Sequence, residues 1–249
     1  MRTKDKKTEW SAETDPLLHP SKIYRCFCMA FTAFTKMALN IHNRIYFQLK
    51  VSGQENLKAM EGPAITICNH VNLLDCAMIA CSVKNHRVFF PAKFNNVKKP
   101  VIGSLVKWLG GIPIENTSEG YRILSNRVEY LLAKGNFVHI FPEGELIFYD
   151  PNLRKFKNGA FWYAYNCDVP IVPMMITYRK REGWRGFFFR RKKRSLNLTI
   201  FPPVYPDRNK ARIEEVIRLK EHCRMLMESA QDEGREQESP RKTPSSRAM

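Results

Sequence analysis

The side chains best suited to chemistry lie in the stretch 64–75, which reads AITICNHVNLLD. An apolar run ends at Asn69 and His70, and Asp75 follows after four intervening residues. A neutral imidazole can take a proton from a hydroxyl at neutral pH, and a nearby carboxylate fixes its tautomer and stabilises the imidazolium that forms. The pair indicates general base catalysis by His70 with Asp75 as its partner. The structural alternative is a loop histidine beside an aspartate that caps a helix.

A strand and a helix must position this pair. Residues 64–68 form a short apolar run, typical of a buried strand in an α/β sheet, and functional residues gather where such strands end. A helix that begins at about Asn72 would place Asp75 in its first turn, where a carboxylate is favoured and can face the loop that carries His70. The sequence thus predicts His70 at the carboxyl end of a strand, within reach of Asp75.

The rest of the chain alternates short apolar runs with amphipathic segments. Further strands are expected at 87–90, 111–115, 137–140, 169–177 and 196–200, and helices at 76–83, 101–109, 119–134, 159–166 and 209–227. This alternation predicts parallel βαβ units, with the functional residues at the carboxyl edge of the sheet. We expect a single α/β domain over 51–230, with a mixed, mostly parallel sheet flanked by helices.

The 249 residues carry a formal net charge of +17, which is unevenly placed. Basic and acidic groups balance within 1–20 and within 231–249, two polar stretches that we expect to be a mobile and a disordered tail. The excess charge therefore lies in the body of the chain, where it would attract nucleic acid, anionic lipid or an acidic protein. Seven cysteines without a Cys-x2-Cys pair predict reduced thiols and no metal site, and the charged first twenty residues predict no signal peptide.

Two segments favour a membrane surface over nucleic acid as the partner. Residues 23–49 are rich in Phe, Met and Ala and contain three cations and no acid, but Lys36 interrupts the apolar run that a spanning helix would need. We expect 21–50 to form an interfacial helix with its cations at headgroup level; the alternative is a helix packed on the domain. Residues 179–194 interleave nine basic residues with aromatics, including three consecutive phenylalanines, which suit a bilayer interface. The alternative for this segment is a solvated hairpin whose aromatics fold inward. Together the two segments predict a peripheral or monotopic protein at the cytoplasmic face of a membrane.

Four short motifs occur in one order. Asn69-His70-x4-Asp75 comes first, followed by Gly111-Ile112-Pro113-Ile114, then Phe141-Pro142-Glu143-Gly144, and finally Val169-Pro170-Ile171-Val172-Pro173. In this order, over about residues 60–205, the chain resembles the glycerolipid acyltransferase family, and most closely the bacterial 1-acylglycerol-3-phosphate acyltransferases.

The resemblance implies transfer of a fatty acyl group from a thioester, acyl-CoA or acyl carrier protein, to the free hydroxyl of lysophosphatidate, giving phosphatidate without a cofactor. It implies that His70 is the general base and Asp75 orients it. It also places Glu143 and Gly144 near the glycerol phosphate, and it associates the strand 170–173 with the acyl pocket or with the frame of the site. The chain has no Gly-x-Ser-x-Gly motif, which agrees with direct attack by the hydroxyl rather than through a serine nucleophile.

Two arginines common in the family are missing. Ile114 is followed by Glu115 and Asn116, and Glu145-Leu146-Ile147 stand where Thr-Arg-Ser is common. Other cations must then bind the acceptor's phosphate, or the acceptor is another lysolipid or an amino-acid-derived lipid. A third possibility is a basic membrane-binding protein with a vestigial site. The residues expected to bind substrate are Asn69, Lys93, Phe141, Pro142, Glu143, Gly144, Arg154 and Lys157.

Overall fold

The computed structural model describes residues 15, 21–83, 86–93, 106, 109–150, 152–179 and 195–238. The helix expected at 101–109 and the basic aromatic segment 179–194 lie almost entirely outside these residues. The two predicted tails do so too, except for Asp15 and residues 231–238. Asp15 is buried, and its carboxylate lies 2.6 Å from Nε of Arg127. At this position the chain is therefore anchored, contrary to the expectation of a mobile tail.

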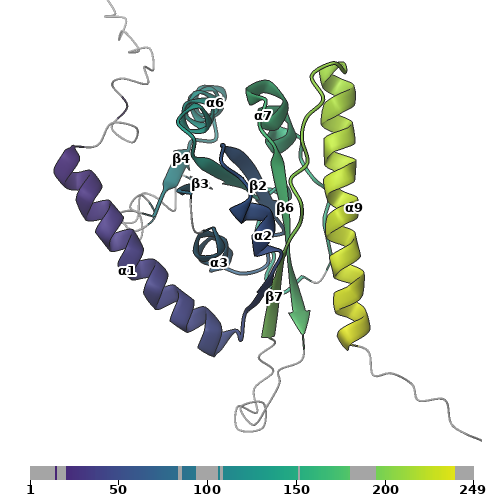
Figure 1. The fold of residues 1–249 in the computed structure, drawn as a ribbon. Coiled ribbons are helices and arrows are strands. Elements are labelled where there is room, and N and C mark those ends of the chain that lie inside the picture. The colour runs from purple at the N-terminus through teal and green to yellow at the C-terminus, as the bar shows by residue number, and fades with distance from the viewer. Residues whose placement is uncertain are drawn as a thin grey trace, which may run out of the picture.

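The described strands form one seven-stranded sheet in the order β1-β7-β6-β2-β5-β3-β4 (Figure 1). The strands are β1 Lys50–Ser52, β2 Ala64–Cys68, β3 Val88–Lys93, β4 Gly111–Ile114, β5 Phe137–Ile140, β6 Ile171–Arg179 and β7 Ser195–Ile200. Neighbouring strands are parallel except β6 and β7. The predicted mixed, mostly parallel α/β sheet is confirmed. Because β2 lies between β5 and β6, the carboxyl ends of these three strands meet at one edge.

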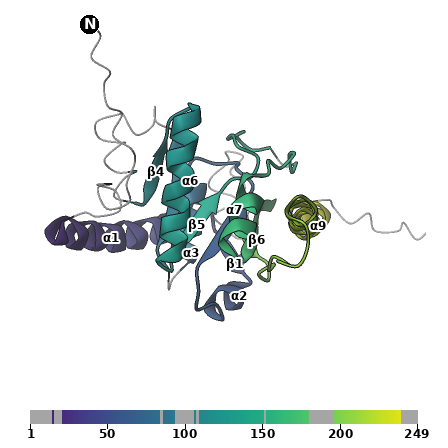
Figure 2. The same ribbon diagram turned by 90° about the horizontal axis from the view of Figure 1, so that it is seen from above.

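Helices cover both faces of the sheet. They are α1 Lys22–Tyr46, α2 Gln54–Lys58, α3 Asp75–Ser82, α6 Ser118–Ala133, α7 Gly159–Cys167 and α9 Arg212–Glu238. Alternate residues of β2 belong to different core clusters: Ile65 and Ile67 pack with residues of α6, α7 and α9, and Ala64 and Cys68 pack with residues of α2 and α3. This two-residue alternation follows from the strand pleat. Seen from above, α1 and α9 lie at opposite ends of the molecule (Figure 2).

Several predicted boundaries are wrong, including those of β3, α3 and α9. The strand β3 continues beyond Phe90 to Lys93, because residues 91–93 pair with β4. The helix α3 begins at Asp75 rather than near Asn72, whose side chain instead accepts from Leu74 N at 3.0 Å within the preceding turn. The last helix continues to Glu238 instead of ending near 227, so 231–238 is not a disordered tail. Residues 227–238 are mostly good helix formers and contain no proline, which accounts for the extension.

The helix α1 packs against α3 and turns its lysine inward. Lys36 Nζ donates to Val83 O at 3.3 Å, at the end of α3, and burial lowers the pKa of this ammonium group. The expectation that Lys36 lies at headgroup level is therefore wrong. The helix packs on the domain with one face only.

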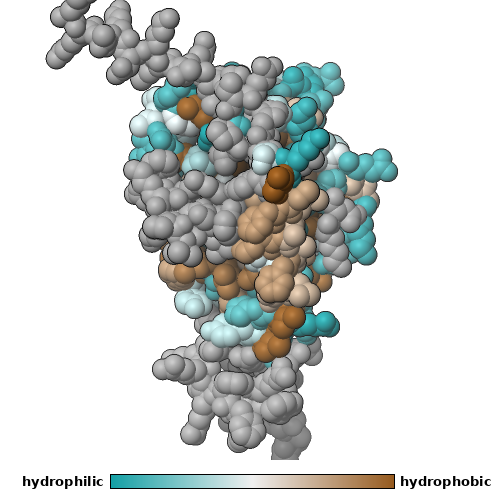
Figure 3. All heavy atoms as spheres, turned by 90° about the vertical axis from the view of Figure 1, so that its left-hand side faces the viewer, coloured by the Kyte–Doolittle hydropathy of each residue, from teal (hydrophilic) through white to brown (hydrophobic). Residues whose placement is uncertain are grey.

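The other face of α1 is apolar and exposed. Its exposed large residues are Ile23, Phe27, Phe34, Met37, Ile41 and Ile45. Figure 3 looks onto this side of the molecule, where much of the surface not drawn in grey is apolar. The exposed cations Lys22 and Arg44 lie at the two ends of the helix. Among the helices that the structure describes, none combines the length and hydropathy needed to cross a bilayer.

Candidate active site

His70 and Asp75 are in contact, as the spacing predicted. His70 lies two residues beyond the end of β2 and is partly exposed, whereas Asp75 begins α3 and is fully buried. His70 Nδ1 lies 3.0 Å from Asp75 Oδ2, and the same oxygen accepts from Val71 N at 2.7 Å and Asn72 N at 2.8 Å. The loop therefore wraps around the carboxylate, which fixes both its own conformation and the imidazole.

These contacts define the tautomer of His70. Asp75 Oδ2 accepts from two backbone N–H groups, so it carries no proton and His70 Nδ1 must be the donor. In the neutral form of the imidazole, the other ring nitrogen, Nε2, then has no proton and can accept one. Burial raises the pKa of Asp75, while its hydrogen bonds from His70, Asn72 and Val71 oppose that rise.

An aromatic ring at the end of the neighbouring strand stacks on the imidazole, and a second ring packs against the first. Phe141, directly after β5, stacks on His70 with ring centroids 3.8 Å apart and planes 11° from parallel. His139, within β5, packs edge-on against Phe141 at 4.5 Å. The site thus forms where β2 and β5 end side by side, as parallel pairing of Ile67 with Ile140 requires.

Glu143 and Arg154 bind each other at this edge. Glu143 is buried, and its carboxylate accepts from His70 N at 3.3 Å, from Arg154 N at 3.0 Å and from the Arg154 guanidinium. Arg154 also donates to Glu145 O at 2.7 Å and to His70 O at 3.4 Å. The two residues join the His70 loop to the loop 152–158. We expected both to bind substrate, and the contacts of the structure show that both also hold the His70 loop.

The helix α9 supports this arrangement from a distance. Arg224 donates to Arg154 O at 2.8 Å and to Leu153 O at 3.3 Å, and its guanidinium lies over the ring of Phe156. Sequence reasoning missed this residue. Seventy positions separate it from Arg154, and no local pattern links the two.

Asn69 and Lys93, two other residues expected to bind substrate, do not lie beside the imidazole of His70 in the same way as Phe141. The Asn69 side chain is buried, donates to Ile176 O at 2.9 Å and accepts from Ile176 N at 2.8 Å. Its amide thus extends the pairing of β2 with β6, and direct substrate contact by this side chain is not supported. Lys93 is exposed at the end of β3, which is two strands from β2, or about 10 Å across the sheet.

Lys157 lies against the turn formed by Pro142 and Gly144. Lys157 N donates to Pro142 O at 2.8 Å, and Gly144 N donates to Phe141 O at 3.1 Å. Gly144 has φ of +80°, and a Cβ built there would come within 2.5 Å of Lys157 Nζ. The ammonium group therefore occupies the space that glycine leaves open.

His139 is a buried imidazole beneath the site that the strand pattern did not single out. Its Nδ1 lies 2.8 Å from Thr66 Oγ1, and its Nε2 has no hydrogen-bond partner among the described residues. Burial, with a smaller contribution from His70 nearby, lowers the pKa of His139 to about 3. The side chain is therefore neutral in the folded protein at all but strongly acidic pH.

Because His139 is buried in its neutral form, we expect the free energy of unfolding to decrease at acidic pH. The unfolded chain protonates His139 below about pH 6.5, whereas the folded protein does not until about pH 3, so stability is lost as pH falls between these values. We expect the free energy of unfolding to fall by about 1.4 kcal/mol per pH unit more in the wild type than in His139→Gln between pH 6 and pH 4. Urea denaturation across that range measures the two slopes. Parallel slopes would show that His139 titrates alike in both states.

The comparisons with known proteins identify the family of the chain. The sequence profile of the Acyltransferase family matches residues 48–177, more than half of the chain, and the chain belongs to this family. It is 30% identical over 132 residues to a chloroplastic 1-acyl-sn-glycerol-3-phosphate acyltransferase of Arabidopsis thaliana, covering 53% of this chain and 36% of that protein. It is 27% identical over 172 residues to the 1-acyl-sn-glycerol-3-phosphate acyltransferase of Bacillus subtilis, covering 69% and 81%. The chain thus spans about a third of the plant relative's length and most of the bacterial one's.

A solved structure shares the fold. The crystal structure of the 1-acyl-sn-glycerophosphate acyltransferase PlsC from Thermotoga maritima matches with a TM-score of 0.62, at 22% identity, over 90% of this chain and 86% of that one. Within the described residues, no three His, Cys, Asp or Glu side chains are grouped so that they could hold a metal ion.

Proposed function

We propose that this protein transfers a fatty acyl group from a thioester to the free hydroxyl of lysophosphatidate, giving phosphatidate. The observation that carries the proposal is the contact between His70 Nδ1 and Asp75 Oδ2, which leaves the partly exposed imidazole with Nε2 as a base. The family membership supports acyl transfer, and the names of the relatives support this acceptor. Acyl-CoA and acyl carrier protein are the two candidate donors.

The chemistry follows from the tautomer. His70 Nε2 takes the proton of the acceptor hydroxyl as its oxygen attacks the thioester carbonyl, and Asp75 stabilises the imidazolium that forms. The tetrahedral intermediate collapses, the carbon–sulfur bond breaks, and the leaving thiolate takes the proton from the imidazolium. A general base of this kind contributes about 10²- to 10⁴-fold to the rate. The stacked ring of Phe141 and the Glu143 carboxylate keep the imidazole and its loop in place for both proton transfers.

The exposed apolar face of α1 supports a peripheral or monotopic location at the cytoplasmic face of an anionic membrane. A helix with an apolar outer face and exposed cations at its ends suits the boundary between headgroups and acyl chains. This placement differs from the sequence prediction in one respect. Lys36 serves the contact with α3, whereas Lys22 and Arg44, near the two ends of the helix, are exposed and can reach headgroups.

We further propose that Lys157 binds the phosphate of the acceptor in place of the missing arginines. Its ammonium group lies over Gly144, beside the turn that the family resemblance places near the glycerol phosphate. We expect Lys157→Ala to raise KM for lysophosphatidate about tenfold with a smaller change in kcat, since one charge-assisted contact contributes about 1.5–3 kcal/mol at most. Lys155→Ala is the matched control, because Lys155 carries the same charge on the same loop. An equal change in both variants would indicate general attraction of anions by the loop.

Release of free thiol from palmitoyl-CoA, and separately from an acyl carrier protein thioester, tests the function. The assay offers lysophosphatidate, other lysolipids and amino-acid-derived lipids as acceptors. Release that depends on lysophosphatidate supports the proposal, and release with another acceptor alone retains the chemistry but changes the substrate. No release with any acceptor, while vesicle binding persists, would identify a membrane-binding protein with a vestigial site.

A further inference from the structure

Four large apolar side chains are exposed beside the candidate active site. They are Leu73, Ile147, Phe148 and Tyr149, with exposed fractions of 70%, 42%, 53% and 62%, and we call them the apolar lip. Leu73 belongs to the loop between His70 and Asp75, and the other three follow the turn that contains Glu143. A group of exposed apolar side chains of this size marks an interaction surface rather than scattered surface residues.

Backbone hydrogen bonds hold the two halves of the apolar lip together. Ile147 N donates to His70 O at 3.3 Å, and Tyr149 N donates to Val71 O at 3.1 Å. Leu73 is two residues beyond Val71, so its backbone lies within about 7 Å of this pairing. The backbone of the lip therefore lies beside the loop that carries the imidazole.

The backbone of Tyr149 has an unfavourable conformation, although its side chain is exposed. Tyr149 has φ of +60°, a left-handed conformation that bulky residues rarely adopt, and its ring is nevertheless mostly in solvent. Strained backbone of this kind gathers at functional sites. Arg154 lies 3.4 Å from Glu145 and 3.9 Å from Asp150, and its positive charge offsets part of the negative charge of the two acids that border the lip.

We propose that the apolar lip inserts into the hydrocarbon of a lipid leaflet, as a second membrane contact beside α1. This inference rests on the proposed function, which places the acceptor in a leaflet. The helix α3 begins two residues after Leu73 and packs against α1, so the lip and the exposed face of α1 flank the same helix. A leaflet that contacts both surfaces would bring the hydroxyl of a single-chain lipid to His70 without moving the lipid into water.

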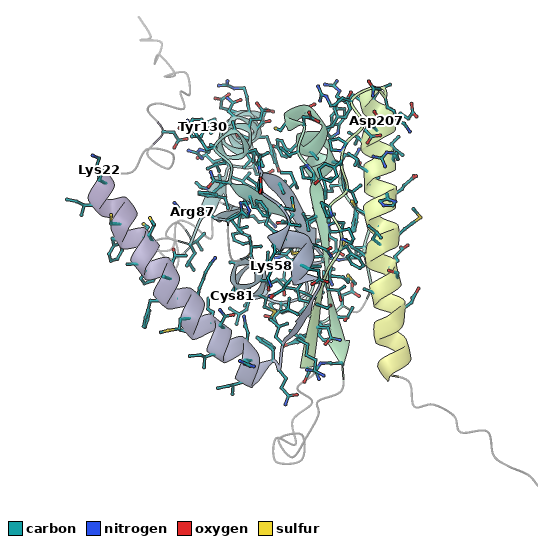
Figure 4. All side chains as sticks on the ribbon, viewed as in Figure 1. Lys22, Lys58, Cys81, Arg87, Tyr130 and Asp207 are labelled. Atoms are coloured by element: carbon teal, nitrogen blue, oxygen red, sulfur yellow. The ribbon has the colours of Figure 1, made fainter. Side chains whose placement is uncertain are left out.

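Fluorescence quenching by lipid tests this inference. Phe148→Trp is compared with Ile213→Trp, an exposed position in the first turn of α9, near Asp207 and at the opposite end from the carboxyl ends of β2 and β6 (Figure 4). The probe is vesicles of phosphatidylcholine and phosphatidylglycerol with brominated acyl chains and no lysolipid. A ring buried about 5–10 Å into the leaflet lies within reach of the bromines. We expect about half of the fluorescence added by Phe148→Trp to be quenched, and almost none of that added by Ile213→Trp.

Three results would overturn the inference: equal quenching of the two variants, quenching only after lysophosphatidate is added, and burial of the introduced tryptophan in a lipid-free dimer. The second would show that the lip holds the substrate's own chain, and the third would identify a second copy of this chain as its partner. A further pair of variants measures affinity. We expect Ile147→Ser/Phe148→Ser to weaken vesicle binding about tenfold and Ile213→Ser to leave it unchanged, with thermal unfolding as the check on folding.

Because quenching needs no turnover, the two proposals can fail separately. Wild-type thiol release without quenching at the lip would overturn the apolar lip alone. Quenching at the lip without thiol release in the presence of any acceptor would overturn the proposed function alone.

Discussion

Replacing His70 with alanine is expected to lower kcat for lysophosphatidate-dependent thiol release by about 10²- to 10⁴-fold. The variant lacks the nitrogen that receives the proton, while Asp75 still accepts from Val71 N and Asn72 N, so the loop retains its conformation. Initial rates with palmitoyl-CoA at saturating acceptor measure the effect. Because the substrates would still bind to the remaining contacts, KM should change far less than kcat.

His222→Ala is the matched control for this experiment. His222 is exposed on α9 and contributes the same side chain away from the site. It should leave both kcat and the thermal midpoint unchanged. If His70→Ala retained more than a tenth of the wild-type rate with an unchanged midpoint, the imidazole would not be the base, and the proposed mechanism would be wrong.

The largest effect on stability is expected for Arg154→Ala. Glu143 is buried and its carboxylate is paired with this guanidinium, so the substitution leaves a buried charge without its partner. Breaking a buried ion pair in this way costs about 3–5 kcal/mol of the free energy of unfolding. The loss should extend to turnover, because the same carboxylate accepts from His70 N. Urea denaturation and thiol release measure the two effects.

Two comparisons separate this pair from a surface charge effect. Arg122→Ala removes an exposed arginine paired with Glu119, and a pair of that kind contributes only about 0–1 kcal/mol. The double variant Arg154→Ala/Glu143→Gln should regain part of the lost stability, since glutamine buries no charge. Equal losses in Arg154→Ala and Arg122→Ala would refute the positioning role given to Arg154.

The local part of the site was predictable from the sequence. His70 and Asp75 are five positions apart, so the short loop between the end of a strand and the start of a helix brings their side chains close together. The neighbourhood of Phe141 was also predictable in outline, because parallel strands bring their carboxyl ends to one edge of the sheet. The observed boundaries of β2 and β5 agree with those predicted from the apolar runs, because an apolar run is a local feature of the sequence.

Only the tertiary structure decided which partners hold the residues of the site together. The sequence motif marked Glu143 as a substrate residue, and the fold pairs it with Arg154 and with His70 N. Likewise Lys36 interrupts an apolar segment in the sequence. In the fold, its ammonium group donates a hydrogen bond to Val83 O at the end of α3.

The physical reason is that residue type and spacing determine local backbone conformation, whereas the partner of a buried polar group depends on long-range packing. The contact of Arg224 with Arg154 O joins residues seventy positions apart and exists only because α9 packs beside the loop 152–158. By residue type His139 could act as a base, but its complete burial in β5 keeps the imidazole neutral within the core. The sequence by itself determined the strand–loop–helix unit that carries the base, and tertiary packing determined the charges and rings that hold that base in position.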